Sequence, residues 1–338
     1  MKFGIIAGPI FPGEWAPQKI YEHIERQAKV AYENNFDGLF SGHHYITGPA
    51  TAILQPVTIL SHLVGRFPGM HVGTSIFLLP FHHPVEVAEQ TACLDILSGG
   101  RFLFGVGQGY RDIEFKSFGV QKESRRQRMV EGIQAIRKLW AEDNVTFRGK
   151  IFHLEGVSIN PKPVQRPGPP VLVGADELGT VSKVPDIGDY WVVSPRHSRR
   201  FLRKAVPLYK AALEHQGRPF KGLPMIRELC VADRAEKAEE RIRLAFENMY
   251  HLYHRWGQPG ERYDLSFEEL KRERLVAGGP GEVAEQIMSY HQEFGAEFMW
   301  FRLYWPGMQP EWALETIQLF GQEVIPEIKR GTPPSQIP

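Results

Sequence analysis

Short apolar segments alternate with helical patterns along the chain, and this alternation restricts its fold more than any other feature. Eight segments have the composition of buried strands, and after most of them apolar residues recur three and four positions apart. Nearly continuous apolar strands joined by amphipathic helices are typical of a parallel sheet covered on both faces. We therefore predict an α/β fold, a (β/α)8 TIM barrel, whose functional groups lie at the carboxyl ends of the strands. The predicted strands are Phe3–Ala7, Gly38–Ser41, Val72–Leu79, Phe102–Val106, Val171–Val173, Tyr190–Val193, Met225–Val231 and Phe298–Leu303.

Two excursions interrupt the alternation. Residues 144–160 follow the fourth predicted helix, Arg125–Trp140, and contain a predicted hairpin turn around Gly149. Residues 257–279 follow the helix Glu236–Trp256 after the seventh strand, and this insertion is predicted to be a lid, because long connections in compact domains are commonly functional. A Pro-rich run leads directly into the fifth strand, so residues 1–338 are predicted to form a single domain. The other predicted helices cover residues 20–31, 53–64, 85–97 and 311–324.

The composition excludes several classes of function. A formal net charge of +1 gives no basic surplus for binding nucleic acid, and no run of about eighteen apolar residues is present for crossing a membrane. The first residues, Met1–Ala7, lack the charged region, long apolar region and cleavage site of a signal peptide. These features predict a cytoplasmic protein with neither a nucleic-acid nor a membrane partner.

Three glycines alternate in the loop after the fourth strand, at Gly105, Gly107 and Gly109. Glycine lets a phosphate or a flat ring approach the backbone closely. The dinucleotide fingerprint has a different spacing and a helix that begins at its last glycine, whereas the next predicted helix here begins near Arg125. A Rossmann site is therefore disfavoured. Arg125 and Arg126 either reach a phosphate near this loop or form a solvated basic face.

Two histidines, His43 and His44, stand at the end of the second strand, where a barrel directs groups toward its mouth. Imidazoles there can move protons near neutral pH. Neighbouring residues of an extended chain point in different directions, so at most one of the two is expected to face a substrate. A metal site needs several His or acidic ligands, and the other strand ends offer mainly Gly, Ser, Pro and Gln, so no metal site is predicted.

Further candidates follow the last strand and the long helix. Arg302 and Trp305 lie near the predicted barrel mouth, and a buried Arg needs an anionic partner or ligand. His254 belongs to a helical stripe with His251 and Arg255, which faces either the site or the solvent.

The order and spacing of several motifs resemble those of the bacterial luciferase-like flavin-dependent oxidoreductases, over nearly the whole chain. The motifs are Gly42–Tyr45 after the second strand, His83–Pro84, Ser98–Arg101 with the glycine loop, Pro169–Gly174, and Gly279–Ala284. The resemblance implies the same barrel, with reduced flavin across its carboxyl-terminal mouth. It also implies a bulge in the third strand with a cis peptide bond, which would be Ser75-Ile76 here.

The implied function is a flavin-dependent monooxygenase of the two-component kind. Such an enzyme takes reduced FMN from a separate flavin reductase and uses O2 to oxygenate a small organic substrate, and the family tends to form homodimers. Two alternatives stay open: a deazaflavin-dependent oxidoreductase that transfers hydride, and a non-catalytic flavin-binding subunit. His43, with its neighbour His44, matches the catalytic position of the family.

The resemblance also assigns binding residues. Those expected at the cofactor are Thr74, Ser75, Ile76, Gly107, Gln108, Gly109, Tyr110, Arg125, Arg126, Ala175, Asp176, Glu177 and Thr180. Those expected in the substrate pocket are Phe11, Phe77, Trp191, His254, Arg302 and Trp305.

This chain departs from the family pattern at three places. Gly42 stands where the family often has Glu, so the role of that carboxylate is missing. Gln108 stands where luciferases carry an Arg for the phosphate. Asp176 and Glu177 are expected to repel a phosphate, which would weaken FMN binding at that loop.

Overall fold

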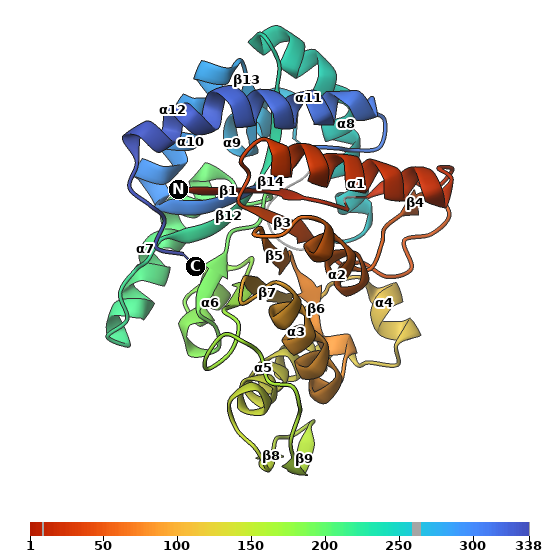
Figure 1. Ribbon diagram of the computed structural model, residues 1–338, viewed down its shortest axis with the longest axis vertical. Coiled ribbons are helices and arrows are strands. Elements are labelled where there is room, and N and C mark those ends of the chain that lie inside the picture. The colour runs from red at the N-terminus through yellow and green to blue at the C-terminus, as the bar shows by residue number, and fades with distance from the viewer. Residues whose placement is uncertain (9, 259–264, 338) are drawn as a thin grey trace.

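The protein curls a parallel β-sheet inside a layer of helices (Figure 1). The structure is a computed structural model that describes residues 1–8, 10–258 and 265–337. Its main sheet has the strand order β11-β10-β7-β5-β3-β1-β14-β12-β13, and β6 pairs with β7. The strands are β1 Lys2–Ile6, β3 Gly38–Ser41, β5 His71–Thr74, β6 Phe77–Leu78, β7 Phe102–Gly107, β10 Val171–Gly174, β11 Tyr190–Val192, β12 Leu223–Val231, β13 Leu275–Gly278 and β14 Ala296–Arg302. Two further strands, β2 Phe11–Pro12 and β4 Thr51–Ala52, pair with each other.

The curl of the sheet brings β11 to β12. Val193, next to β11, donates a backbone hydrogen bond to Pro224 O and accepts one from Ile226 N, each at 2.9 Å. Every pairing within the main sheet is parallel. The carboxyl ends of its strands therefore lie at one end of the molecule.

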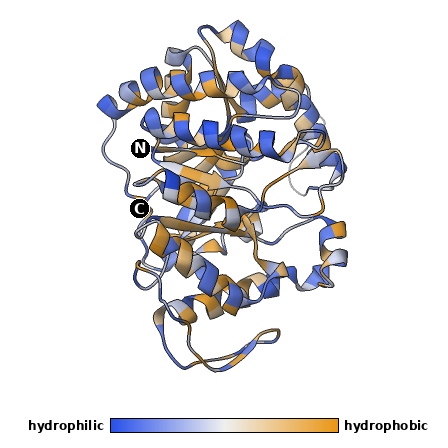
Figure 2. Ribbon diagram, turned by 45° about the vertical axis from the view of Figure 1, so that its right-hand side comes forward, coloured by the Kyte–Doolittle hydropathy of each residue, from blue (hydrophilic) through white to orange (hydrophobic). Residues whose placement is uncertain are grey.

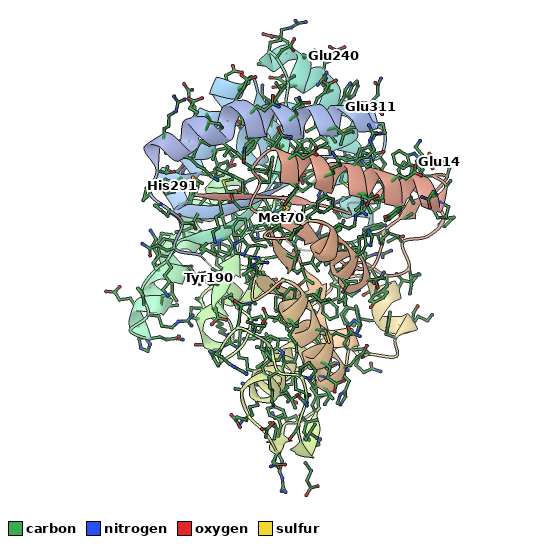
Figure 3. The ribbon with its side chains drawn as sticks, viewed as in Figure 1. Glu14, Met70, Tyr190, Glu240, His291 and Glu311 are labelled. Carbon is green, nitrogen blue, oxygen red and sulfur yellow. The ribbon has the colours of Figure 1, made fainter. Side chains whose placement is uncertain are left out.

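Helices cover the outside of this sheet, with their apolar residues inward (Figure 2). Several of them begin with proline, which is favoured at the first helical position because its missing N–H has no partner to lose there. The charged residues Glu240 and Glu311 lie on outer helix faces (Figure 3). The helices are α1 Pro17–Glu33, α2 Pro56–Arg66, α3 Pro84–Leu97, α4 Asp112–Ser117, α5 Arg125–Ala141, α6 Leu178–Val181, α7 Arg199–His215, α8 Ala235–Arg255, α9 Phe267–Arg274, α10 Pro280–Phe294, α11 Pro310–Leu319 and α12 Ile325–Gly331, with shorter turns at Leu79–Phe81, Lys122–Ser124, Val184–Asp186 and Phe320–Val324.

The predicted strands are present, and one of them is divided. The third ends as β5 at Thr74 and resumes as β6 at Phe77, and the Ser75-Ile76 peptide bond between them is cis, as expected. The other seven differ from the prediction by two residues or fewer at either end. Helices α4, α6, α7, α9, α10 and α12 were not predicted.

The predicted lid over residues 257–279 is wrong for its second half. Residues 259–264 lie outside the described residues, but Phe267–Arg274 form α9 and Leu275–Gly278 form β13, which pairs with β12. Phe267 and Leu270 are buried, and so is all of β13. Burial of these apolar side chains fixes the segment against the sheet and α8.

An apolar inner cluster fills the space enclosed by the curled sheet. At its centre Phe40 and Trp300 stack with ring centroids 4.0 Å apart, next to Gly73, where a Cβ atom would lie 2.6 Å from the Phe40 ring. Trp300 Nε1 also donates a hydrogen bond to Ser75 Oγ at 2.8 Å. The cluster therefore packs tightly beneath the break between β5 and β6. Its members are Ile6, Phe40, Leu103, Leu172, Tyr190, Val192, Ile226, Phe298, Trp300 and Ile337.

The predicted hairpin is present as β8 Val145–Arg148 and β9 His153–Val157, which pair antiparallel at one end of the molecule (Figure 1). Glu131 of α5 holds its turn by accepting backbone hydrogen bonds from Lys150, Ile151 and Phe152 at 2.8–3.1 Å. Burial alone would raise the pKa of Glu131, but Gln127 and these three donors outweigh it and lower the pKa to about 2.

Glu131→Gln is expected to destabilise the protein by about 1–3 kcal/mol, because hydrogen bonds to a charged acceptor are replaced by weaker ones. Urea unfolding at pH 7 measures the change. The matched control is Glu155→Gln, an exposed position in β9 of the same hairpin. The folded-state pKa of Glu131 lies below its unfolded value, so the stabilisation is present above about pH 4.5 and lost as the pH falls toward 2. Equal stability of the two variants would contradict the role of Glu131.

Candidate functional site

A cavity of about 540 Å³ lies at the carboxyl ends of the strands. The loops after β3, β5, β7, β10 and β11 contribute to its lining, together with side chains of β12, α8 and β14. The structure thus brings together residues that are far apart in the sequence. The sequence-predicted site residues that line the cavity are His43, His44, Ser75, Ile76, Gly107, Gln108, Gly109, Tyr110, Arg125, Arg126, Ala175, Asp176, Glu177, Thr180 and Arg302.

One side of the cavity is formed by Ser75, Ile76 and Gly107–Tyr110, here called the glycine wall. A Cβ atom on Gly105 would lie 2.0 Å from Thr74 O, and one on Gly107 would lie 1.9 Å from Ile76 Cδ1. Gly105 is therefore required by the backbone between β5 and β6, which presses against β7, whereas Gly107 leaves room for the Ile76 side chain. Gly109 is different, because its φ of 72° is in the left-handed region that favours glycine.

His43 is held in one orientation at the end of β3. Its Nδ1 accepts a hydrogen bond from the Leu78 backbone N–H at 3.2 Å, and its ring packs against Phe77 and Tyr45. Burial, followed by the neighbouring His82 and His44, lowers its pKa to about 3, and Gln55 only partly opposes this shift. At neutral pH the ring is therefore neutral, with its proton on Nε2. Within the described part of the chain, that nitrogen has no hydrogen-bond partner.

His44 lies beside a buried carboxylate that the sequence did not reveal. Its Nδ1 is 3.5 Å from Oε1 of Glu114, which belongs to α4 and is fully buried. Glu114 also accepts from the Tyr45 backbone N–H at 2.9 Å and from Arg111 Nη1 at 3.3 Å. Gly42 brings no carboxylate, but Glu114 brings one to His44 from another element.

Arg111 joins three elements beside the cavity. It donates to the backbone carbonyls of Tyr45 and Ile46, and its guanidinium lies 4.2 Å from the ring centre of Trp256. The Trp256 ring in turn packs edge-on against His44. The loop after β3, helix α4 and the end of α8 therefore meet at one place.

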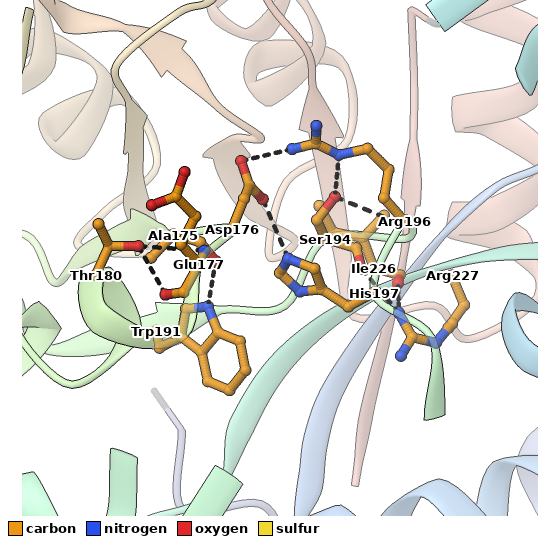
Figure 4. A network of polar contacts seen from close by, with 10 residues as sticks. All are labelled: Ala175, Asp176, Glu177, Thr180, Trp191, Ser194, Arg196, His197, Ile226 and Arg227. Carbon is orange, nitrogen blue, oxygen red and sulfur yellow. Dashed lines mark hydrogen bonds and ion pairs between the residues drawn. The ribbon is translucent and has the colours of Figure 1, made fainter. Parts of the chain in front are cut away.

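Asp176, which was expected to repel a phosphate, is paired within the protein. Its carboxylate contacts Arg196 Nη2 at 2.8 Å and His197 Nε2 at 3.1 Å (Figure 4). Burial would raise the pKa of Asp176, but Arg196 and His197 outweigh it and hold the pKa well below its usual range. Its negative charge is therefore compensated at the cavity wall.

Glu177 and Thr180 are hydrogen-bonded to each other at the start of α6 (Figure 4). Thr180 Oγ1 donates to Glu177 O at 2.8 Å and accepts from Glu177 N at 3.2 Å. The Glu177 side chain is exposed at the edge of the cavity. The Thr180 hydroxyl thus has a local role that the sequence analysis did not foresee.

Three cationic residues, Lys122, Arg125 and Arg126, line the cavity at the start of α5 and are here called the cationic rim. Lys122 pairs with Asp112, and Arg125 Nη1 donates to Lys122 O at 3.0 Å. Arg126 is exposed. Lys122 was not predicted.

Three predicted pocket aromatics lie in the core and do not line the cavity. Phe11 packs with Trp15, His23 and Tyr304 between the start of the chain and α1. The prediction for Trp191 is corrected because its side chain points away from the inner cluster toward Tyr209, and its Nε1 donates to Ala175 O. The prediction for Trp305 is corrected because its ring is fully buried against Phe246.

Three other predicted residues are also outside the cavity lining. His254 is exposed on the outer face of α8. Phe77 lies behind the His43 ring and supports it. Thr74 is buried, and its hydroxyl donates to Gly105 O at 2.7 Å, which ties β5 to β7.

A charged residue that was not predicted from the sequence lies opposite the glycine wall. Glu228 of β12 lines the cavity, and its Oε1 lies 3.6 Å from Nη1 of Arg302. Burial raises the pKa of Glu228 above its usual range although Arg302 and Arg227 oppose this. The adjacent charges Arg227 and Glu228 inside an otherwise apolar strand were the available signal. The two side chains lie on opposite faces of the sheet, because successive residues of a strand point in opposite directions. Arg227 faces outward, and its guanidinium lies 4.6 Å from the Tyr290 ring centre.

The described residues contain no group of three or more His, Cys, Asp and Glu side chains that could hold a metal ion. Of the helices that these residues form, none has the length and apolar composition required to cross a bilayer.

Comparison with known proteins gives a family match and several similar structures. The family model described as luciferase-like monooxygenase matches residues 1–297. The oxygenase component of flavin-dependent trigonelline monooxygenase from Acinetobacter baylyi is 25% identical over 296 residues, which cover 81% of each chain. The crystal structure of monooxygenase RslO1 from Streptomyces bottropensis is 26% identical, with a TM-score of 0.85 over 97% of this chain and 99% of that one. The oxygenating constituent of 3,6-diketocamphane monooxygenase from Pseudomonas putida, solved in complex with FMN, shares the fold at 16% identity, with a TM-score of 0.79 and the same coverage.

Proposed function

The chain belongs to the luciferase-like monooxygenase family of flavin-dependent monooxygenases, and we propose that it is the oxygenase component of a two-component system. In this proposal a separate flavin reductase supplies reduced FMN, and the enzyme uses O2 to oxygenate a small organic substrate. The single observation that carries the proposal is the cavity, in which the glycine wall, the buried His43 and the cationic rim meet. The relative from Acinetobacter baylyi, itself named an oxygenase component, supports the need for a reductase.

The residues of the cavity fit FMN. The glycine wall offers a surface of backbone and Ile76 for a flat ring, because Gly107 carries no side chain there. The cationic rim offers Arg125 and Arg126 to a phosphate, and Gln108 offers an amide hydrogen bond. Asp176 does not oppose the phosphate, because Arg196 compensates its charge and His197 engages its second oxygen.

His43 is the proposed proton-handling residue. Its Nδ1 is occupied by the Leu78 N–H, so a hydrogen bond to bound ligand would come from Nε2–H. Reduced flavin would supply the electrons that activate O2. Beside it, a neutral imidazole can donate a hydrogen bond without adding a charge to the site. His44 would contribute through its contact with Glu114, which fixes the loop that carries both histidines.

We infer that the curled sheet is a closed (β/α)8 barrel and that the chain is a single domain. The hydrogen bonds of Val193 with Pro224 and Ile226 support closure, because they join β11 to β12 and leave β13 as an added strand beside β12. A cytoplasmic location and a homodimer remain predictions from the sequence.

The direct test supplies the protein with chemically reduced FMN, O2 and a panel of small organic substrates. We expect substrate-dependent formation of an oxygenated product that contains one atom from ¹⁸O2. The deazaflavin alternative is tested in parallel with the reduced deazaflavin coenzyme and no oxygen. If only the deazaflavin coenzyme supports turnover, the proposed monooxygenase is overturned. If no turnover is seen with either cofactor, a non-catalytic subunit is favoured.

Replacing the rim arginines is expected to weaken FMN binding selectively. Arg125→Met and Arg126→Met should each raise the Kd for FMN by about 10-fold, because each removes a charge-assisted hydrogen bond to the phosphate. Calorimetric titration with FMN and with riboflavin measures the effect, and the riboflavin Kd should stay unchanged. Arg148→Met, on the exposed side of the hairpin, is the matched control. Equal losses for FMN and riboflavin would argue against a phosphate site at the rim.

A further inference from the structure

Glu228 and Arg302 form an incompletely satisfied charged pair in the cavity. Glu228 is 1% exposed, and both residues line the cavity. The 3.6 Å between Glu228 Oε1 and Arg302 Nη1 is too long for a good hydrogen bond. Among the described residues, Glu228 Oε2 and Arg302 Nη1 have no hydrogen-bond partner at all. Buried polar atoms are nearly always hydrogen-bonded in native proteins, so an unsatisfied acceptor and donor on one cavity point to a ligand.

The pair lies away from the proposed cofactor position. In the sheet, β1 and β3 separate β14 from β5, the strand that ends at the glycine wall. A molecule at Glu228 and Arg302 would therefore face a ring resting on the glycine wall from across the cavity. This is where a substrate belongs if the proposed function holds.

The chemistry of the pair selects a hydroxyl group. A hydroxyl donates one hydrogen bond and accepts others, so it can serve Glu228 and Arg302 together. A carboxylate would meet Arg302 but would be repelled by Glu228, and an ammonium group would have the opposite conflict. A ketone oxygen would satisfy Arg302 alone and leave Glu228 unpaired.

The surrounding side chains select a flat ring. Met249, Tyr250 and Tyr253 of α8 also line the cavity, and the Arg302 guanidinium lies 5.3 Å from the Tyr253 ring centre. Aromatic side chains contact other rings in offset or edge-on arrangements. The ligand that matches both observations is an aromatic ring that carries a hydroxyl group.

We propose that the substrate is a hydroxylated aromatic compound, a phenol or a fused-ring analogue, whose hydroxyl donates to Glu228 and accepts from Arg302. This assignment rests on the proposed function, because it takes the cavity as the active site. It identifies Glu228 as a substrate-binding residue and gives Arg302 Nη1 a hydrogen-bond partner.

The proposal is tested by the binding of three probes that share one ring system: 2-naphthol, naphthalene and 2-naphthoate. Dissociation constants are measured by calorimetry on the full-length protein, with and without FMN. We expect 2-naphthol to bind about 10-fold or more tightly than naphthalene, as for a hydrogen bond to a charged group. We also expect it to bind more tightly than 2-naphthoate.

Variants of the pair separate the two contacts. Glu228→Gln should reduce the preference for 2-naphthol over naphthalene to about 3-fold or less and should improve the binding of 2-naphthoate, because the repelling charge is gone. Arg302→Met should weaken 2-naphthol by about 10-fold. Glu240→Gln, on the outer face of α8, is the matched control (Figure 3). Thermal melting shows whether each variant is folded, and the wild-type probe series decides if one is not.

Three results would overturn the assignment: tighter wild-type binding of 2-naphthoate than of 2-naphthol, equal binding of naphthalene and 2-naphthol, or no binding of 2-naphthol. These readouts do not depend on turnover. Failure of oxygenation with FMN would refute the proposed function while the binding preference stands. Conversely, oxygenation of other substrates without a 2-naphthol preference would refute only the substrate class.

Discussion

His43→Ala is expected to lower the yield of oxygenated product by about 100-fold to 10,000-fold, the range for loss of a positioned proton donor or acceptor. The reason is geometric, because His43 lines the cavity with Nδ1 already engaged by Leu78 and with Nε2–H unpartnered among the described residues. Single-turnover mixing of reduced FMN, O2 and substrate, followed by product analysis, measures the effect. Binding of FMN should change little, which separates a chemical role from a binding role.

His254→Ala is the matched control for this variant. His254 was predicted from the sequence to face the pocket but is exposed on α8, so its removal should leave the product yield unchanged. The pH dependence gives a second check. With a pKa of about 3, His43 becomes charged only as the pH falls toward that value, so it should add no titration step between about pH 6 and 8. A normal product yield from His43→Ala would exclude His43 from the mechanism.

Gly105→Ala is expected to destabilise the protein by about 3 kcal/mol or more, at the upper end of overpacking effects. The added Cβ would lie 2.0 Å from the backbone oxygen of Thr74, which cannot rotate away as a side chain can. Relief requires β5 to separate from β7, and this would also break the hydrogen bond from Thr74 Oγ1 to Gly105 O. Urea unfolding measures the free energy, and FMN binding should fall with it because the glycine wall moves.

Alanine substitutions at two other glycines, Gly65 and Gly107, serve as comparisons for Gly105→Ala. Gly65→Ala in α2 meets no atom within 4 Å and should stabilise the protein by about 0.5–1 kcal/mol, since alanine favours the helix and restricts the unfolded chain. Gly107→Ala should cost less than Gly105→Ala, because its closest clash is with the end of the Ile76 side chain. If Gly105→Ala were as stable as wild type, the proposed reason for the alternating glycines would be wrong.

The sequence predicted the strands well because each is a short apolar run, but it did not predict which face each side chain occupies. In β11, Tyr190 and Val192 belong to the inner cluster whereas Trp191 packs outward against Tyr209. Strands buried on both faces carry apolar residues at every position, so the alternation that reveals orientation is absent. In β12 the two adjacent charges, Arg227 and Glu228, mark the strand as unusual, but the sequence does not show which of them faces the cavity.

Contacts between distant elements were the other part that the sequence could not supply. Helix α4 is six residues long, too short for a helical period to be recognised, yet it carries Glu114 to His44. Similarly, the sequence alone indicates that Asp176 would repel a phosphate, because it does not show that Arg196 and His197 contact the Asp176 carboxylate. The glycine loop was located correctly, but two of its glycines serve the bulge of β5 and β6 and only indirectly a ligand.

The inner cluster has a consequence for how water and protons travel. Ile6, Val192 and Ile226 belong both to this cluster and to the lining of the cavity, so the cavity floor is apolar. Just beneath the glycine wall, the stacked rings of Phe40 and Trp300 continue this floor, and the indole N–H of Trp300 is already committed to Ser75. Hydrocarbon and stacked rings relay no protons, so protons and water reach the cavity from the side away from this floor, where the exposed Arg126 and Glu177 line its edge. The side chains at that edge therefore govern how readily water reaches a reactive species bound in the cavity.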